Sequence, residues 1–166
     1  KEPWRPVSVF RTYEAHVVQV RPWMPHAIGD VIYIAFGMAD LSCFMPFYQG
    51  LESVPEHYQI GTDQADSASV YWKFRKLQTL VMTNYEVYAP RVKKAFAEQE
   101  QALSAKQAKL EEEYMALVKT DKEAATALLQ KVNLEMLAET EALCEKLTNQ
   151  VFTLATETIQ KDIFFA

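Results

Sequence analysis

Residues 7–37 read VSVFRTYEAHVVQVRPWMPHAIGDVIYIAFG, and this stretch contains two segments with the composition of β-strands. Residues 7–20 are rich in β-branched and aromatic side chains and are closed by two prolines, as expected for one long strand. Residues 31–36 are apolar at every position, which indicates a strand that is covered on both faces or lies in an inner sheet layer. The first part of the chain therefore predicts a sheet.

The second part of the chain is built differently, because all four glycines and all seven prolines lie within the first 90 residues. From Asp66 onward the apolar residues recur at helical spacing. Pro90 suits the first turn of a helix, and Thr120–Glu123 has the pattern of a capping box. We expect strands and loops within residues 1–62, followed by helices at 66–89, 90–118 and 121–160, the last two forming an antiparallel hairpin.

Composition and charge exclude several classes of function. The net charge of -5, with 22 acidic against 17 basic residues, provides no basic field for nucleic acid. The longest uncharged apolar run, residues 31–39, is about half the length of a membrane-spanning helix, so we expect no membrane partner. Neither the three histidines nor Cys43 and Cys144 have metal-ligand spacing, and there is no glycine-rich phosphate loop. We therefore predict no metal, no cofactor and a cytoplasmic location.

Arg11 fits its surroundings least. On a strand it shares a face with apolar neighbours such as Val9 and Val17. A buried arginine needs an acceptor there, because an unpaired buried charge is strongly unfavourable. Two interpretations stay open: a structural carboxylate meets Arg11, or Arg11 stabilises a thiolate or holds an anionic substrate group.

Other chemical candidates have simpler explanations. Cys43 has no cation or helix amino terminus beside it in the sequence, so it is predicted to be a small core thiol, like Cys144. The run of three glutamates at residues 111–113 has the pattern of a solvated helix face.

Four short motifs follow one another in an order that a known family shares. They are Arg11-Thr12 on the first strand, Val18-Gln19-Val20-Arg21 with Trp23 and Pro25, an apolar strand that reaches Gly37 before Pro46-Phe47-Tyr48, and Ser67-Ala68-Ser69-Val70-Tyr71-Trp72-Lys73-Phe74 at the first helix. As a set they resemble the carboxyl-terminal half of dipeptidase A-type cysteine peptidases. These enzymes belong to the N-terminal-nucleophile hydrolases and are related to secernins. The resemblance covers about residues 5–118.

The resemblance implies an α+β fold. It is a four-layer αββα sandwich with helices outside two antiparallel sheets, to which this chain contributes strands and one helical layer. It also implies a mechanism in which a cysteine made amino-terminal by processing attacks the peptide carbonyl. Its own α-amine acts as general base, and the resulting acyl-enzyme is hydrolysed while fixed donors stabilise the oxyanion.

The chain begins with Lys1, and the Cys-Thr-Thr opening typical of the family is absent. Cys43 cannot replace that cysteine, because it has no free α-amine. We therefore expect residues 1–166 to be a single segment, the carboxyl-terminal part of a larger catalytic domain, inactive alone and with the nucleophile upstream. Expected partners are a dipeptide substrate, the missing amino-terminal half and a second copy of the protein.

Three residues are predicted for the site. Related amidases place an arginine on a comparable strand beside the nucleophile. The resemblance therefore implies that Arg11 supports the upstream cysteine nucleophile. Asp40 and Ser42, just past Gly37 at the end of the inner strand, are placed where a substrate pocket could be lined; a polar turn is the alternative. Two other functions remain: a non-catalytic, secernin-like protein, and a helical module for oligomerisation or interaction.

Overall fold

The computed structural model describes the backbone of residues 7–165 and the side chains of residues 7–160, so Lys1 and the rest of residues 1–6 lie outside it. Three strands form an antiparallel sheet in the order β1-β2-β3. Glu14 pairs with Phe36 and Val20 with Asp30, while Val31 pairs with Tyr48. The strands are β1 (Glu14–Val20), β2 (Asp30–Phe36) and β3 (Met45–Tyr48).

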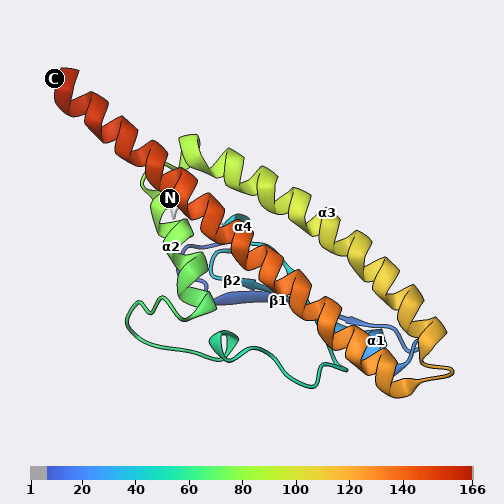
Figure 1. The fold of residues 1–166 in the computed structure, drawn as a ribbon. Coiled ribbons are helices and arrows are strands. Elements are labelled where there is room, and N and C mark those ends of the chain that lie inside the picture. Colours follow the sequence, from blue (N-terminus) through green and yellow to red (C-terminus); the bar gives the residue numbers. More distant parts are fainter. Residues whose placement is uncertain (1–6, 166) are drawn as a thin grey trace.

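Helices make up most of the remainder, so the α+β class is confirmed. The main ones are α2 (Val70–Met82), α3 (Tyr85–Leu117) and α4 (Lys122–Phe165); shorter turns are α1 (His26–Gly29), η1 (Ala39–Leu41) and η2 (Glu56–Tyr58). Helices α3 and α4 run side by side as an antiparallel hairpin, and the carboxyl end of α4 extends beyond the start of α3 (Figure 1).

The first strand is shorter than its composition predicts. It begins at Glu14 instead of Val7, and the amide of Thr12 donates to the carbonyl of Val9 at 3.0 Å, which closes a turn. The partner strand β2 ends at Phe36, and the amide of Gly37 makes the next bond, to the carbonyl of Tyr13 at 2.7 Å. Beyond that point β1 has no strand to pair with, so the apolar residues before it do not extend the sheet.

The break between the first two helices is also displaced. It falls at Thr83 and Asn84, and Pro90 lies inside α3. Asn84 has φ -154° and ψ 79°, which is not helical, whereas Pro90 within the helix removes a single backbone hydrogen bond. At the next turn, the carboxylate of Asp121 accepts from the amide of Ala124 at 2.9 Å, so Asp121 caps α4 in place of the predicted Thr120.

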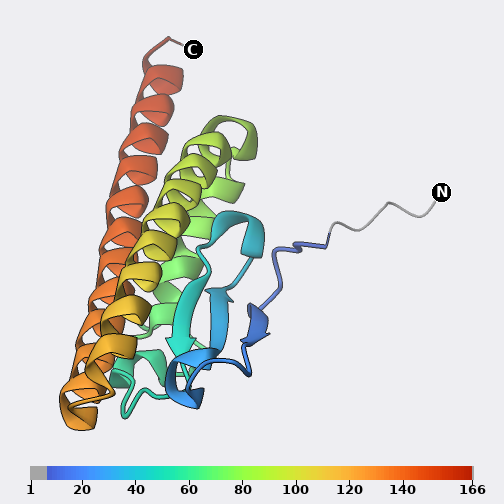
Figure 2. The same ribbon diagram turned by 90° about the vertical axis from the view of Figure 1, so that its right-hand side faces the viewer.

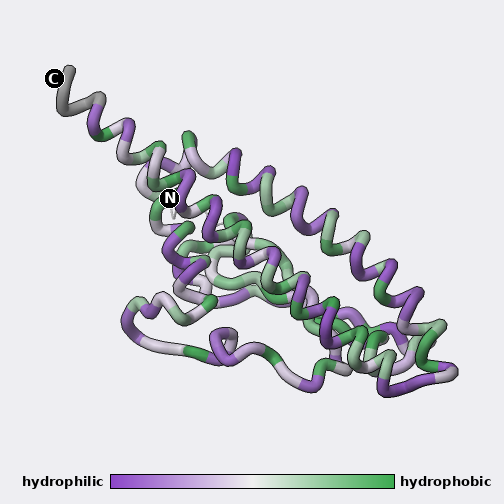
Figure 3. Tube along the Cα trace, in the orientation of Figure 1, coloured by the Kyte–Doolittle hydropathy of each residue, from purple (hydrophilic) through white to green (hydrophobic). Residues whose placement is uncertain are grey.

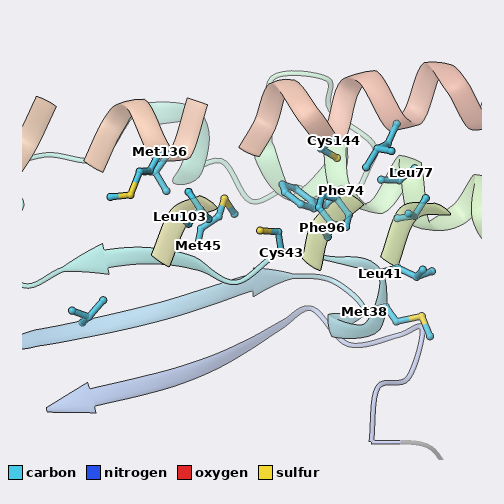
Figure 4. Packing of buried hydrophobic residues seen from close by; sticks show 14 of the residues in the cluster. Met38, Leu41, Cys43, Met45, Phe74, Leu77, Phe96, Leu103, Met136 and Cys144 are labelled. Atoms are coloured by element: carbon cyan, nitrogen blue, oxygen red, sulfur yellow. The ribbon is translucent and has the colours of Figure 1, made fainter. Parts of the chain in front are cut away.

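The core lies between the sheet and the three long helices, which gather on one side of it (Figure 2). Hydrophobic and hydrophilic residues alternate along α3 and α4 (Figure 3), as their one-sided burial requires. Figure 4 shows side chains of this core from four elements: Met45 from β3, Phe74 from α2, Phe96 from α3 and Met136 from α4. Each of these four side chains is at most 2% exposed.

The sheet is covered on one face only. Val31 and Ala35 of β2 are completely buried. Ile32, which lies on the opposite face of the strand, is 40% exposed. Strand β1 lies farthest from the helices (Figure 2), and six of its seven residues are exposed. The prediction that β2 is covered on both faces is therefore not met by the described part of this chain.

Candidate functional site

The predicted site residues lie in two segments at one end of the sheet. Because β1 and β2 are antiparallel, the residues before β1 meet those after β2. The amide of Gly37 donates to the carbonyl of Tyr13, and the amide of Asp40 donates to Ser8 Oγ at 2.9 Å. The structure therefore brings the Arg11 segment and the Asp40 segment into contact.

Arg11 itself is not where the sequence predicts it. It lies in the turn before β1 and is exposed, so the expectation of an arginine buried among apolar residues on a strand is wrong. Among the side chains of residues 7–160, no hydrogen bond or ion pair joins its guanidinium to another side chain. The group is thus presented at the surface, at the end of the sheet.

Asp40 is engaged in the fold. Its carboxylate lies 2.8 Å from Lys93 Nζ and accepts a hydrogen bond from the hydroxyl of Tyr85, both on α3. Burial raises the pKa of Asp40, but the hydrogen bonds from Lys93 and Tyr85 outweigh it and lower the pKa below its ordinary value. The carboxylate therefore fixes η1 to α3, which favours the polar-turn interpretation.

Ser42 is buried, with 5% of its surface exposed. Its Oγ has no hydrogen-bond partner among the residues whose side chains are described, 7–160. Leaving a buried hydroxyl unpaired costs about 1–3 kcal/mol. In this arrangement the hydroxyl does not reach solvent, and it lines neither of the two surface hollows described for residues 7–165.

Arg75 on α2 was missed by the sequence interpretation. Only 8% of it is exposed, and it donates to the carbonyl of Phe10 and, at 2.8 Å, to that of Thr12. Its guanidinium lies 4.7 Å from the ring centroid of Phe10 and 5.4 Å from that of Tyr71. The signal was present, because Arg75 follows Phe74 within the apolar stripe of α2.

Gln78, one turn further along α2, is completely buried and holds the other segment. Its Oε1 accepts from the amide of Met38 at 3.0 Å, and its Nε2 donates to the carbonyl of Phe36 at 2.9 Å. Gly37 between them has φ +71°, and a Cβ there would lie 2.3 Å from Gln78 Oε1. Only glycine accommodates both the backbone angle and the amide.

A second, part-buried contact corrects the interpretation of residues 111–113 for Glu111 alone, because Glu112 and Glu113 are exposed as predicted. Arg21 forms a bidentate pair with Glu111, at 2.8 Å and 2.6 Å, and both side chains are at most 16% exposed. The hydroxyl of Tyr48 donates to the same carboxylate at 2.8 Å. The hydrogen bond to Glu111 is the largest cause that raises the pKa of Arg21. This pair holds the β1–β2 connection against α3.

Glu141 on α4 holds the long loop that precedes α2. It lies 2.8 Å from Nε2 of His57 and 3.0 Å from Nζ of Lys73. Burial raises the pKa of Glu141, but hydrogen bonds from His57, Tyr58 and Lys73 lower it below its ordinary value. His57 thereby has a structural contact with the carboxylate of Glu141.

The two cysteines are core residues, as predicted. Cys43 and Cys144 are both completely buried, and burial raises the pKa of each thiol to about 12 (Figure 4). Neither is therefore a nucleophile in this state. Within residues 7–160, whose side chains the structure describes, no group of three or more His, Cys, Asp or Glu side chains could hold a metal ion. Among the same residues no helix is both long and apolar enough to cross a membrane.

The open face of the sheet forms the apolar wall of a surface hollow of about 870 Å³. Val18 and Ile32, a cross-strand pair, are 55% and 40% exposed there. The opposite wall is the loop from Leu51 to Gln59, in which Tyr58 packs on Phe36 with ring centroids 6.0 Å apart.

Comparison with known proteins gives consistent matches. The sequence model of peptidase family C69 matches residues 1–98. A probable dipeptidase of Salmonella dublin is 58% identical over 64 residues, which are 39% of this chain and 14% of that protein. Dipeptidase A of Lactobacillus helveticus is 32% identical over 88 residues, 53% of this chain and 18% of the relative. The alignment with probable dipeptidase B of Streptococcus pyogenes serotype M1 covers 81% of this chain at 25% identity, but 27% of the relative. The chain thus spans less than a third of each of these three relatives.

Proposed function

Because the chain belongs to peptidase family C69, we propose that it is the carboxyl-terminal part of a dipeptidase that hydrolyses the peptide bond of dipeptides. The names of the relatives support the substrate class. Their greater length supports the view that this chain is one part of the enzyme. On this proposal the segment alone is inactive.

The observation that carries the proposal is the open apolar face of the sheet. Val18 and Ile32 expose about half of their surface on it, while Val31 and Ala35 on the opposite face of β2 are completely buried. Two antiparallel sheets that pack face to face cover such surfaces mutually. We assign the missing layer to a second sheet from the upstream part of the enzyme, which would complete an αββα sandwich.

The proposed reaction begins with an amino-terminal cysteine that precedes this segment. Its thiolate attacks the carbonyl carbon of the dipeptide, and its α-amino group takes the thiol proton and passes it to the leaving amine. That amine is the carboxyl-terminal amino acid, which leaves first. Water then hydrolyses the thioester and releases the amino-terminal amino acid and the free thiol. No metal or organic cofactor takes part. Cys43 and Cys144 have no role in this chemistry, because both are buried with a raised pKa.

Arg11 is proposed to face that cysteine. Its exposed guanidinium lies at the end of the sheet, and a cation beside a thiol favours the thiolate. Asp40 and Ser42 are proposed to support substrate binding by shaping the segment after β2, since Asp40 is paired with Lys93 and Ser42 is buried.

The test is turnover of a mixed dipeptide panel by the full-length protein, with and without iodoacetamide and with and without EDTA. The proposal expects hydrolysis that alkylation abolishes and chelation does not change. Cys43→Ala serves as the control, because inhibition by iodoacetamide should persist in it. Absence of turnover on every dipeptide, or turnover indifferent to alkylation, would contradict the proposal.

A second role in assembly is favoured by the carboxyl end of α4. Phe152 and Ile159, seven residues apart near the carboxyl end of this helix, are each 60% exposed. That end of α4 extends beyond the start of α3 (Figure 1). We propose that a second copy of the protein packs there. Light scattering of the full-length protein should give a dimer or larger, and Phe152→Lys with Ile159→Lys should reduce its mass. A wild-type monomer would contradict this role.

A further inference from the structure

The contacts of Arg75 are centred on the residue proposed for catalysis. Its Nη1 donates to the carbonyl of Phe10 and its Nη2 to that of Thr12, the residues on either side of Arg11. Two carbonyls held by one planar group fix both the position and the orientation of the peptide units between them. The side chain of Arg11 remains outside this contact and exposed.

The environment of Arg75 is unusual for a buried cation. Its polar acceptors among residues 7–160 are neutral: the two carbonyls, the hydroxyl of Tyr71 at 3.0 Å and, at 3.5 Å, the amide of Gln78. A buried arginine that only stabilised the fold would be expected to meet a carboxylate. Here the charge is held by carbonyl dipoles and by the rings of Phe10 and Tyr71, which suits orientation of the chain more than charge neutralisation.

Helix α2 holds both halves of the proposed site from adjacent turns. Arg75 binds the segment before β1, and Gln78 binds the segment after β2 through the amide of Met38 and the carbonyl of Phe36. The side chains of Arg75 and Gln78 also touch each other. A displacement of Arg75 is therefore transmitted to Arg11 directly and to the Asp40 segment through Gln78.

We infer that Arg75 is a positioning residue of this enzyme, which orients Arg11 by holding the two carbonyl groups that flank it. The inference rests on the proposed function for its catalytic consequence, whereas the holding of the segment is independent of it. A misplacement of about 1 Å at a reacting group lowers a rate by about 10²-fold. Arg75→Lys, which keeps the charge but loses the planar fork, should therefore lower kcat by about that factor with a smaller change in KM.

The kinetic test is a double-mutant cycle in the full-length enzyme. If Arg75 acts through Arg11, Arg75→Lys should lower kcat strongly in the wild type but by less than about twofold in an Arg11→Ala background. Tyr71→Phe, which removes one acceptor of the guanidinium without leaving a cavity, should also lower kcat. It keeps the test informative if Arg75→Lys does not fold. The matched control is Lys76→Arg, an exposed position on the same helix, which should leave kcat unchanged. Equal losses in both backgrounds would overturn the inference.

A second measurement does not depend on activity. Hydrogen exchange of the peptide covering residues 8–13 should be at least about tenfold faster in Arg75→Lys and Tyr71→Phe than in the wild type or Lys76→Arg, because the segment loses its anchor. Exchange elsewhere in α2 reports whether the helix itself is intact. Unchanged exchange in residues 8–13 would overturn the inference whatever the activity. If the wild type hydrolyses no dipeptide, the proposed function fails. The hydrogen-exchange measurement then decides by itself whether Arg75 holds residues 8–13.

Discussion

Replacement of Gly37 by alanine tests how α2 holds the end of β2. At φ +71° an alanine costs about 1–2 kcal/mol in backbone strain. Its Cβ would lie 2.3 Å from Oε1 and 2.8 Å from Nε2 of Gln78, so that side chain must leave its place. The bonds to Met38 and Phe36 are then lost, at about 1 kcal/mol each. Gly37→Ala should lower the free energy of unfolding by about 3–4 kcal/mol.

The two parts of this effect separate in a double-mutant cycle followed by urea denaturation of the full-length protein. Gln78→Ala removes the atoms that the new methyl group meets, so in that background Gly37→Ala should cost only the backbone strain of about 1–2 kcal/mol. The coupling energy is then about 2 kcal/mol. Gly61→Ala is the control, because a Cβ at Gly61 meets no atom within 4 Å.

Two results would refute the reasoning. If Gly37→Ala has the same effect with and without the amide of Gln78, then the side chain does not occupy the space beside Gly37. If Gly37→Ala and Gly61→Ala are equally mild, the segment after β2 relaxes freely and α2 does not fix it.

Three further perturbations have definite expected outcomes. Glu111→Gln weakens its mostly buried pair with Arg21 and should lower the free energy of unfolding by about 3 kcal/mol in urea denaturation. The control Glu112→Gln, at an exposed position, should lower it by less than about 0.5 kcal/mol. The folded pKa of Glu141 lies below its ordinary 4.5, so the stability it contributes is present above that pH and is lost as the pH falls through the folded value. The stability difference between wild type and Glu141→Gln should therefore shrink from pH 7 to pH 3 in urea denaturation; a constant difference would contradict it. Ile32→Asp should lower the thermal unfolding temperature of the full-length protein if a second sheet covers it, while Val87→Asp at an exposed helix position should not.

The sequence pattern predicted those features that depend on local periodicity. The apolar run of β2, the helical spacing after Asp66 and the hairpin of the last two helices are all found. The family resemblance from the motifs between Arg11 and Phe74 is confirmed by the match to residues 1–98. In each case the signal lies within a few neighbouring residues, or in the order of short motifs.

The predictions that failed depend on contacts between distant residues. Arg11 was expected on a strand, but the strand ends where its partner β2 ends, and the carbonyls beside Arg11 are bound by Arg75 from 63 or more positions away. Glu111 was expected in solvent because of its acidic neighbours, yet Arg21, 90 positions earlier, meets it. Neither partner can be inferred from the local sequence.

The segments held at one end of the sheet and the exposed apolar sheet face beside them together indicate where the rest of the proposed enzyme would pack. Polar groups on α2 and α3, namely the buried Arg75 and Gln78 and the exposed Lys93, hold the two segments at one end of the sheet. The adjoining sheet face, with Val18 and Ile32, remains uncovered and apolar. Segments held in place beside an exposed apolar sheet face are expected where a further layer of chain packs on that face. On the proposed function, the upstream nucleophile would lie on that layer, opposite the exposed guanidinium of Arg11, so that closing the sandwich would also complete the site.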